Sequence, residues 1–182
     1  MATDAHSEGS GYRGTVNSRP SAAATYERAR RLANVAMWSI ELQCRRLGDV
    51  EPEDTEFVLR RWADFDFLIV ALTRLRRATS LAAKIPQLQA SLDTALVEFD
   101  KALPDLKKMR DVAEHADDYA LDHGRQKTVA RQSLGVSTIE ADGPTLCWLQ
   151  ARLNAREACR ASRALFAALK EASRRFRAGS SE

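Results

Sequence analysis

The residues best suited to chemistry are Arg110 and His115, which are separated by four residues in a segment of strong helical character. A histidine can transfer a proton near neutral pH, and an arginine can hold a phosphate through a planar fork of N–H donors. The other two histidines are less suited, because His6 lies in a polar segment rich in glycine and serine and His123 lies where the helix should end. These residue types at this spacing therefore indicate general acid–base catalysis on a phosphate.

On a helical wheel of about 100° per residue, this segment divides into two faces. The apolar face comprises Leu106, Met109, Ala113, Ala116 and Ala120. His115 lies opposite, and Asp111 and Tyr119 share its face, so we expect Asp111 to hydrogen-bond His115 and fix its tautomer. Arg110 lies about 140° from His115, so the two meet only if the arginine bends round or a second subunit completes the site. The alternative is an exposed histidine beside an Arg110–Glu114 helix pair.

The pattern Arg110-Asp111-x-x-x-His115, on a late helix of a helical domain, resembles the R-x4-6-H motif of the HEPN superfamily. The resemblance covers the motif and the helical layout. It implies a compact helical fold and a homodimer that brings two motifs together. We expect the face with His115, Val112 and Tyr119 to lie at or beside that dimer interface.

The resemblance further implies a metal-independent endoribonuclease, or a protein derived from one, of the kind found in toxin–antitoxin and defence systems. The candidate catalytic residues are Arg110, Asp111 and His115, with His115 as acid or base for the RNA 2′-OH and Arg110 on the phosphoryl oxygens. No cofactor or metal is expected. The alternative function is a non-catalytic helical interaction module whose partner is an antitoxin or a regulatory protein.

A second candidate surface is a basic ridge that we define by Arg152, Arg156, Arg160 and Arg163. Their three- and four-residue steps place them on one side of the last helix, where they could follow an RNA backbone. The alternative is a solvated face, which is also our interpretation of the cluster from Arg74 to Arg77. The chain has 22 arginines and 6 lysines at a net charge of +3. Arginine suits phosphate recognition, although GC-rich coding DNA produces the same bias.

Composition sets the broad class of protein. The chain has 182 residues, with 45% hydrophobic and 29% charged residues, which is typical of one soluble domain. We expect a disordered leader at 1–21, a single helical domain at 22–178 and a disordered tail at 179–182. No apolar stretch is long enough to cross a membrane and no signal peptide is visible. The three cysteines form no CxxC pair, so we expect reduced thiols in a cytoplasmic protein.

Apolar periodicity and turn residues predict the elements. Helices are expected from about Ala22 to Leu47, from about Glu53 to Ala83, from Pro86 onward, from Pro104 to near Gly124, and from Asn154 to about Arg177. Residues 134–140 and 145–150 are expected to form a β-hairpin around a turn at 141–144, and the alternative is that helix resumes at Pro144. The predicted fold is all-α: a bundle of about five helices with a small β-hairpin inserted before the last helix.

Overall fold

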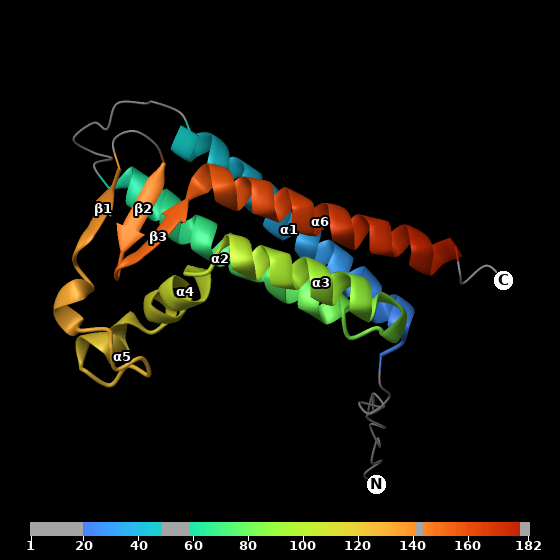
Figure 1. Cartoon of the computed structure of the whole chain (residues 1–182), viewed down its shortest axis with the longest axis horizontal. Coiled ribbons are helices and arrows are strands. Elements are labelled where there is room, and N and C mark those ends of the chain that lie inside the picture. Colours follow the sequence, from blue (N-terminus) through green and yellow to red (C-terminus); the bar gives the residue numbers. More distant parts are fainter. Residues whose placement is uncertain (1–19, 49–58, 141–143, 179–182) are drawn as a thin grey trace, which may run out of the picture.

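The computed structural model of the chain describes residues 20–48, 59–140 and 144–178 (Figure 1). The helices in these residues are α1 (Ala22–Gly48), α2 (Arg60–Ala82), α3 (Pro86–Ala102), α4 (Leu106–Glu114), α5 (Ala116–Ala120) and α6 (Ala155–Ala178). The strands are β1 (Ser137–Ile139), β2 (Thr145–Trp148) and β3 (Ala151–Asn154), and a 3-10 turn covers Arg131–Ser133. The predicted helical bundle with a small β-structure before the last helix is confirmed. The predicted leader up to residue 19, the tail and the start of the second helix at Glu53 lie outside the described residues.

Four long helices form the body of the protein. In Figure 1, α1, α2, α3 and α6 run alongside one another, while the sheet, α4 and α5 gather at one end. Helix α2 is central, because it contacts α1, α3, α4 and α6. Its sequence explains this position: apolar residues occur on several of its sides and are buried at Phe65, Leu68, Ile69, Leu72 and Leu75. The buried carboxylate of Asp64 on α2 is paired with Arg46 Nε on α1 at 2.7 Å.

Two helix boundaries follow directly from local sequence. Helix α1 begins at Ala22 as predicted and ends at Gly48, with a buried stripe that includes Ala29, Ala33 and Ile40. Helix α3 begins at Pro86, where a missing backbone N–H costs no hydrogen bond. These two boundaries agree with the expected ones because the signals that set them lie within one turn of the helix ends.

The β-structure is a three-stranded antiparallel sheet in the order β1-β2-β3, so the predicted hairpin gains a third strand. Between β2 and β3, Leu149 and Gln150 both have φ of 58°. Two successive residues with positive φ are what a type I′ turn requires, and such turns usually contain Asn or Gly. Asn154 then begins α6, because its Oδ1 accepts hydrogen bonds from the backbone N–H groups of Arg156 and Glu157. The predicted start of the last helix at Asn154 is confirmed, and the alternative of a helix resuming at Pro144 is wrong.

The predicted fourth helix is interrupted at His115, which has non-helical dihedral angles (φ −127°, ψ 34°) and separates α4 from α5. The expected apolar stripe is therefore only partly correct: Leu106 and Met109 are buried, but the alanines at 113, 116 and 120 are exposed. The residues buried instead are Val112 and Tyr119, which pack against Leu149 of the β2–β3 turn as a second small core. Because Val112 and Tyr119 are buried within one chain, they are not free to form the expected dimer face.

None of the described helices combines the length and apolar character that a membrane crossing requires. The three cysteines are free thiols, and Cys44 on α1 donates a hydrogen bond to the carbonyl of Ala155 at the start of α6. One turn away, Arg163 on α6 is paired with Glu41 on α1 at 2.7 Å. These two polar contacts join the first and last helices, which also pack through the shared apolar core.

Candidate phosphate-binding site

Arg110 lies in a pocket between α2 and the start of α4. The pocket has a volume of about 320 Å³ and is lined by Thr73, Arg76, Arg77, Asp100, Leu103, Pro104, Leu106, Lys107 and Arg110. Its four cationic side chains come from α2 and α4, which pack against each other. We call this site, defined by Arg76, Arg77, Lys107 and Arg110, the basic pocket.

Two carboxylates partly neutralise the basic pocket. Asp100 accepts two hydrogen bonds from Arg76, each of 2.6 Å. Glu114 accepts one of 2.7 Å from Arg110, and one of its oxygens lies 3.9 Å from Arg77. Lys107 is exposed and has no salt bridge to any residue that the structure describes. Four cations against two carboxylates leave the pocket positive, which favours an anion.

The guanidinium of Arg110 is incompletely satisfied. Its side chain is only 20% exposed, and its Nε atom is buried without a hydrogen-bond partner. A buried donor without an acceptor costs about 1–3 kcal/mol of desolvation. An anion that enters the pocket would supply this acceptor, and the planar fork of arginine suits the oxygens of a phosphate.

The structure does not bring Arg110 and His115 together within one chain. The helix pair that the sequence offered as the alternative, Arg110–Glu114, is formed. His115 is not among the residues that line the basic pocket, and its side chain is 40% exposed with Nδ1 3.9 Å from Asp118 Oδ2. His115 does follow Glu114 directly in the chain, so it lies next to the residue that joins Arg110 and Arg77.

The expected hydrogen bond between Asp111 and His115 is not formed, because other donors occupy the carboxylate. Asp111 Oδ2 accepts from the Tyr119 hydroxyl at 3.2 Å and from Gln126 Nε2 at 3.3 Å. Partial burial raises the pKa of Asp111, but these two hydrogen bonds and the charges of Arg110 and His115 outweigh burial and lower it. Asp111 therefore stays ionised and connects α4 to α5 and to the segment after α5.

The four arginines of the basic ridge do not form one surface. Arg152 lies on β3 rather than on α6, and its guanidinium is paired with Glu140 at 2.6 Å. Arg163 makes two hydrogen bonds to Glu41. Only Arg156 and Arg160 are exposed on α6 without a salt bridge to the described residues. A phosphate that bound at Arg152 or Arg163 would compete with a carboxylate already in place.

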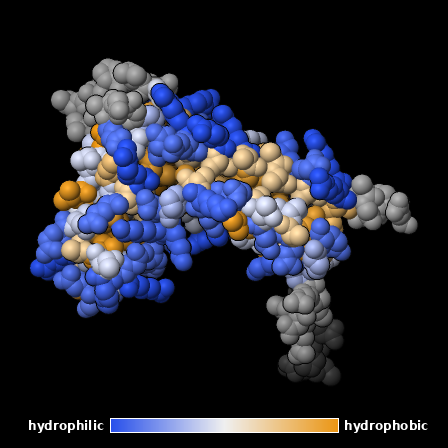
Figure 2. Space-filling view, in the orientation of Figure 1, coloured by the Kyte–Doolittle hydropathy of each residue, from blue (hydrophilic) through white to orange (hydrophobic). Residues whose placement is uncertain are grey.

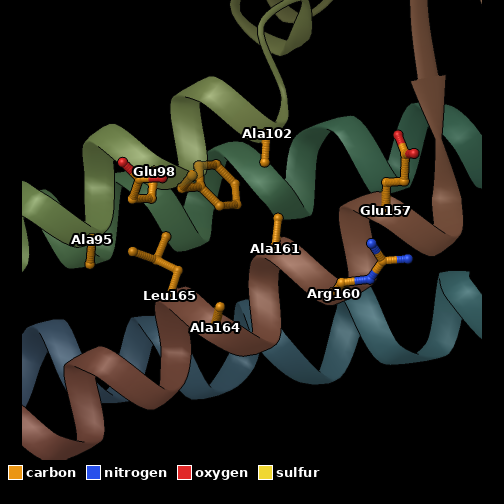
Figure 3. A pocket seen from close by; sticks show the side chains of 9 residues that line it. Ala95, Glu98, Ala102, Glu157, Arg160, Ala161, Ala164 and Leu165 are labelled. Carbon is orange, nitrogen blue, oxygen red and sulfur yellow. The ribbon is translucent and has the colours of Figure 1, made fainter.

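A second hollow lies between α3 and α6 and has a volume of about 470 Å³. Figure 2 shows a pale apolar band in this region with hydrophilic residues on both sides. Figure 3 shows that small side chains line it: Ala95 and Ala102 from α3, and Ala161 and Ala164 from α6. Glu98, Glu157 and Arg160 are the charged side chains at this hollow, which we call the α3–α6 groove. It is suited to apolar contact and is separate from the basic pocket.

Three residues of the basic pocket were missed from the sequence. Arg76 and Arg77 belong to the cluster that we interpreted as a solvated face, and Lys107 was not considered. The available signal was the step of three residues between Lys107 and Arg110, which places both on one side of α4. Comparison of the chain with family models, with curated proteins and with solved structures finds no match.

Proposed function

We propose that the protein binds RNA through the basic pocket, with a backbone phosphate held by Arg110 and Lys107. The observation that carries the proposal is the buried Nε of Arg110, a donor without a partner in a pocket with four cations. A phosphate would pair this donor and meet the excess positive charge at the same time. On this proposal the chain is the non-catalytic or RNase-derived form of a HEPN-like protein.

Cleavage of RNA is the second candidate function, and it requires a substrate phosphate that brings Arg110 and His115 to one site. His115 follows Glu114, so a substrate that displaced this carboxylate from Arg110 would reach the segment that carries the imidazole. In that reaction the 2′-OH would attack the adjacent phosphorus while His115 takes its proton, and the bond from phosphorus to the 5′-oxygen would break as solvent water protonates the leaving oxygen. The products would be a 2′,3′-cyclic phosphate and a 5′-OH end, with no metal in the step.

Binding is tested with a labelled single-stranded RNA and fluorescence anisotropy over a series of salt concentrations. Lys107→Glu should weaken binding at least fivefold and reduce the slope of log K against log salt by about 0.7, the value for one phosphate contact on a single strand. The matched control is Lys84→Glu, which makes the same charge change at an exposed site outside the pocket. Equal losses of RNA affinity in Lys107→Glu and Lys84→Glu would mean that RNA is attracted by the overall charge of the protein and not by the basic pocket. That result would overturn the proposal.

A gain-of-binding variant gives an independent measurement. Asp100→Asn removes a carboxylate from the basic pocket and frees the Arg76 guanidinium from its pair. We expect this variant to bind the same RNA two- to fivefold more tightly at low salt. Unchanged or weaker binding, with the fold intact by circular dichroism, would contradict a phosphate site at this position.

Cleavage is tested with the same RNA in the presence of a chelator. If His115 acts on the 2′-OH, the wild-type protein should release a 2′,3′-cyclic phosphate and His115→Ala should abolish it while binding stays unchanged. Since the His115 side chain is 40% exposed, this substitution should shift stability by less than about 0.5 kcal/mol. Binding without cleavage would leave the RNA-binding proposal standing and remove the catalytic candidate.

A further inference from the structure

The basic pocket is small for a site that binds a chain of phosphates. Its volume of about 320 Å³ is near the lower end of the range for small-molecule sites, about 300–1,000 Å³, and it is more enclosed than the α3–α6 groove. Leu103 and Leu106 are buried in its wall, and Pro104 lines it at the turn from α3 to α4. A hollow of this size holds one phosphorylated group and leaves little room for a strand that passes through it.

Three cationic side chains of the pocket keep donors that no carboxylate occupies. Lys107 has no salt bridge to the described residues, and Arg77 reaches Glu114 only at 3.9 Å. Arg110 keeps its buried Nε without an acceptor. An internal phosphate of RNA has two unesterified oxygens, whereas a phosphate monoester at a chain end has three, with a charge of about −1.5 to −2 at pH 7. Three donor groups therefore match the three oxygens of a monoester.

The charge balance of the pocket also favours a monoester. Its four cations are paired with two carboxylates, Asp100 and Glu114, so among the described residues two positive charges remain in excess. A doubly charged monoester neutralises this excess, whereas a singly charged diester leaves half of it. The pocket therefore gains more electrostatic free energy from a phosphate at a chain end than from one inside the chain.

Carboxylates follow the basic pocket along the chain on its α4 side. Glu114 ends α4, and Asp117 and Asp118 are exposed in the first turn of α5, which lies directly beyond α4 (Figure 1). An RNA strand that continued past the pocket in this direction would bring its next phosphate toward these carboxylates, and the like charges would repel. A chain end avoids this repulsion, because its remaining phosphates lie on one side only.

From these features we propose that the basic pocket recognises the phosphate monoester at an end of an RNA chain and discriminates against RNA whose ends are hydroxyls. This inference rests on the proposed function, because it specifies which phosphate of an RNA the pocket holds: the last one of the backbone. The rest of the RNA leaves the pocket on the side away from α5, where Asp117 and Asp118 do not oppose it.

Fluorescence anisotropy with matched RNAs tests the proposal on the full chain. Two RNAs of one sequence carry a 5′-phosphate or a 3′-phosphate, and a third is one nucleotide longer with hydroxyl ends, so that all three have the same number of phosphates. We expect at least one phosphorylated RNA to bind about fivefold more tightly than the hydroxyl-ended RNA. Lys107→Glu should bring this ratio of affinities to about one, whereas Lys84→Glu, at an exposed site outside the pocket, should preserve it.

A second variant tests the role of α5. Asp117→Asn combined with Asp118→Asn leaves the basic pocket intact but removes the repulsion, so the hydroxyl-ended RNA should bind more tightly and the ratio should fall about twofold. A ratio that this variant leaves unchanged would overturn the exclusion by α5.

The outcomes separate this inference from the proposed function. Equal affinities of the wild-type protein for phosphorylated and hydroxyl-ended RNA would overturn the inference. The proposed function would still stand if Lys107→Glu weakened the binding of both. A ratio that survives in Lys107→Glu would also overturn the inference, since the RNA end would then be recognised elsewhere. Absence of binding to every RNA would overturn both.

Discussion

Replacement of Gly124 by alanine tests the packing around Tyr119, at the end of the molecule that contains α4 and α5. A Cβ atom at this position would lie 2.1 Å from Tyr119 Cδ1, 2.3 Å from Cε1 and 2.6 Å from Cγ. These distances are far inside van der Waals contact, so the ring of Tyr119 has to move. The ring is buried against Val112 and Leu149, and its hydroxyl bonds to Asp111 and to the backbone N–H of Gln126.

The expected cost follows from these contacts. Overpacking of a buried site costs about 1–3 kcal/mol, and each hydrogen bond lost by the hydroxyl adds about 0.5–1.5 kcal/mol. We therefore expect the free energy of unfolding of Gly124→Ala to fall by about 2–4 kcal/mol and Tm to fall by roughly 5–10 °C. Urea denaturation followed by far-ultraviolet circular dichroism measures the first quantity and a thermal melt the second.

The chain provides a matched control at Gly135. No atom lies within 4 Å of a Cβ added there, and its φ is not positive. Gly135→Ala should therefore change the free energy of unfolding by less than about 0.5 kcal/mol. A Gly124→Ala protein as stable as Gly135→Ala would refute the packing described for Tyr119. A double variant with Tyr119→Leu should lose less than the sum of the two single changes, because the clash requires the ring.

Two further predictions concern Asp111 and the basic ridge. Because the folded state lowers the pKa of Asp111, its stabilising contribution is present above the ordinary carboxyl pKa of about 3.9 and is lost as pH falls through the lowered value. The difference in Tm between wild type and Asp111→Asn should therefore be constant from about pH 5 to 8 and shrink as the pH falls below the ordinary carboxyl pKa of about 3.9. The double change Arg156→Glu with Arg160→Glu should weaken binding to all RNA sequences alike and leave Tm nearly unchanged. Unchanged binding at low salt would identify the ridge as a solvated face.

The sequence was informative where a local signal sets the structure. The start of α3 at Pro86 and the start of α6 after Asn154 depend on residues within one turn, and both were predicted correctly. Strand β3 was missed because Leu149 and Gln150 are not residues that indicate a type I′ turn. The break at His115 was missed for a related reason: burial of Tyr119 beside Leu149 depends on a contact across 30 residues that helical periodicity does not contain.

The candidate site was predictable only in part, because it also depends on contacts between segments that are distant in the sequence. Arg110 was identified from its spacing to His115, but its actual neighbours Arg76 and Arg77 come from a different helix. A wheel drawn on one helix cannot show which second helix packs against it. The number of arginines in the basic ridge that are free to bind a phosphate was overestimated. Arg152 pairs with Glu140 and Arg163 pairs with Glu41, and both pairs depend on contacts between distant segments.

The turn between β2 and β3 also has a consequence for the order of folding. Lys108 on α4 donates a hydrogen bond to the carbonyl of Leu149 at 2.5 Å, and Asp105, just before α4, accepts one from the backbone N–H of Arg152 at 3.0 Å. These bonds join positions 41 and 47 residues apart, so α4 gains them only after residues 149–152 have left the ribosome. We expect α1, α2 and α3 to pair first during synthesis, since their contacts are between neighbouring helices. The pocket around Arg110 is lined by residues 73–110 and depends on α2–α4 packing, so its phosphate-binding surface can form on a nascent chain before the sheet adds its bonds to α4.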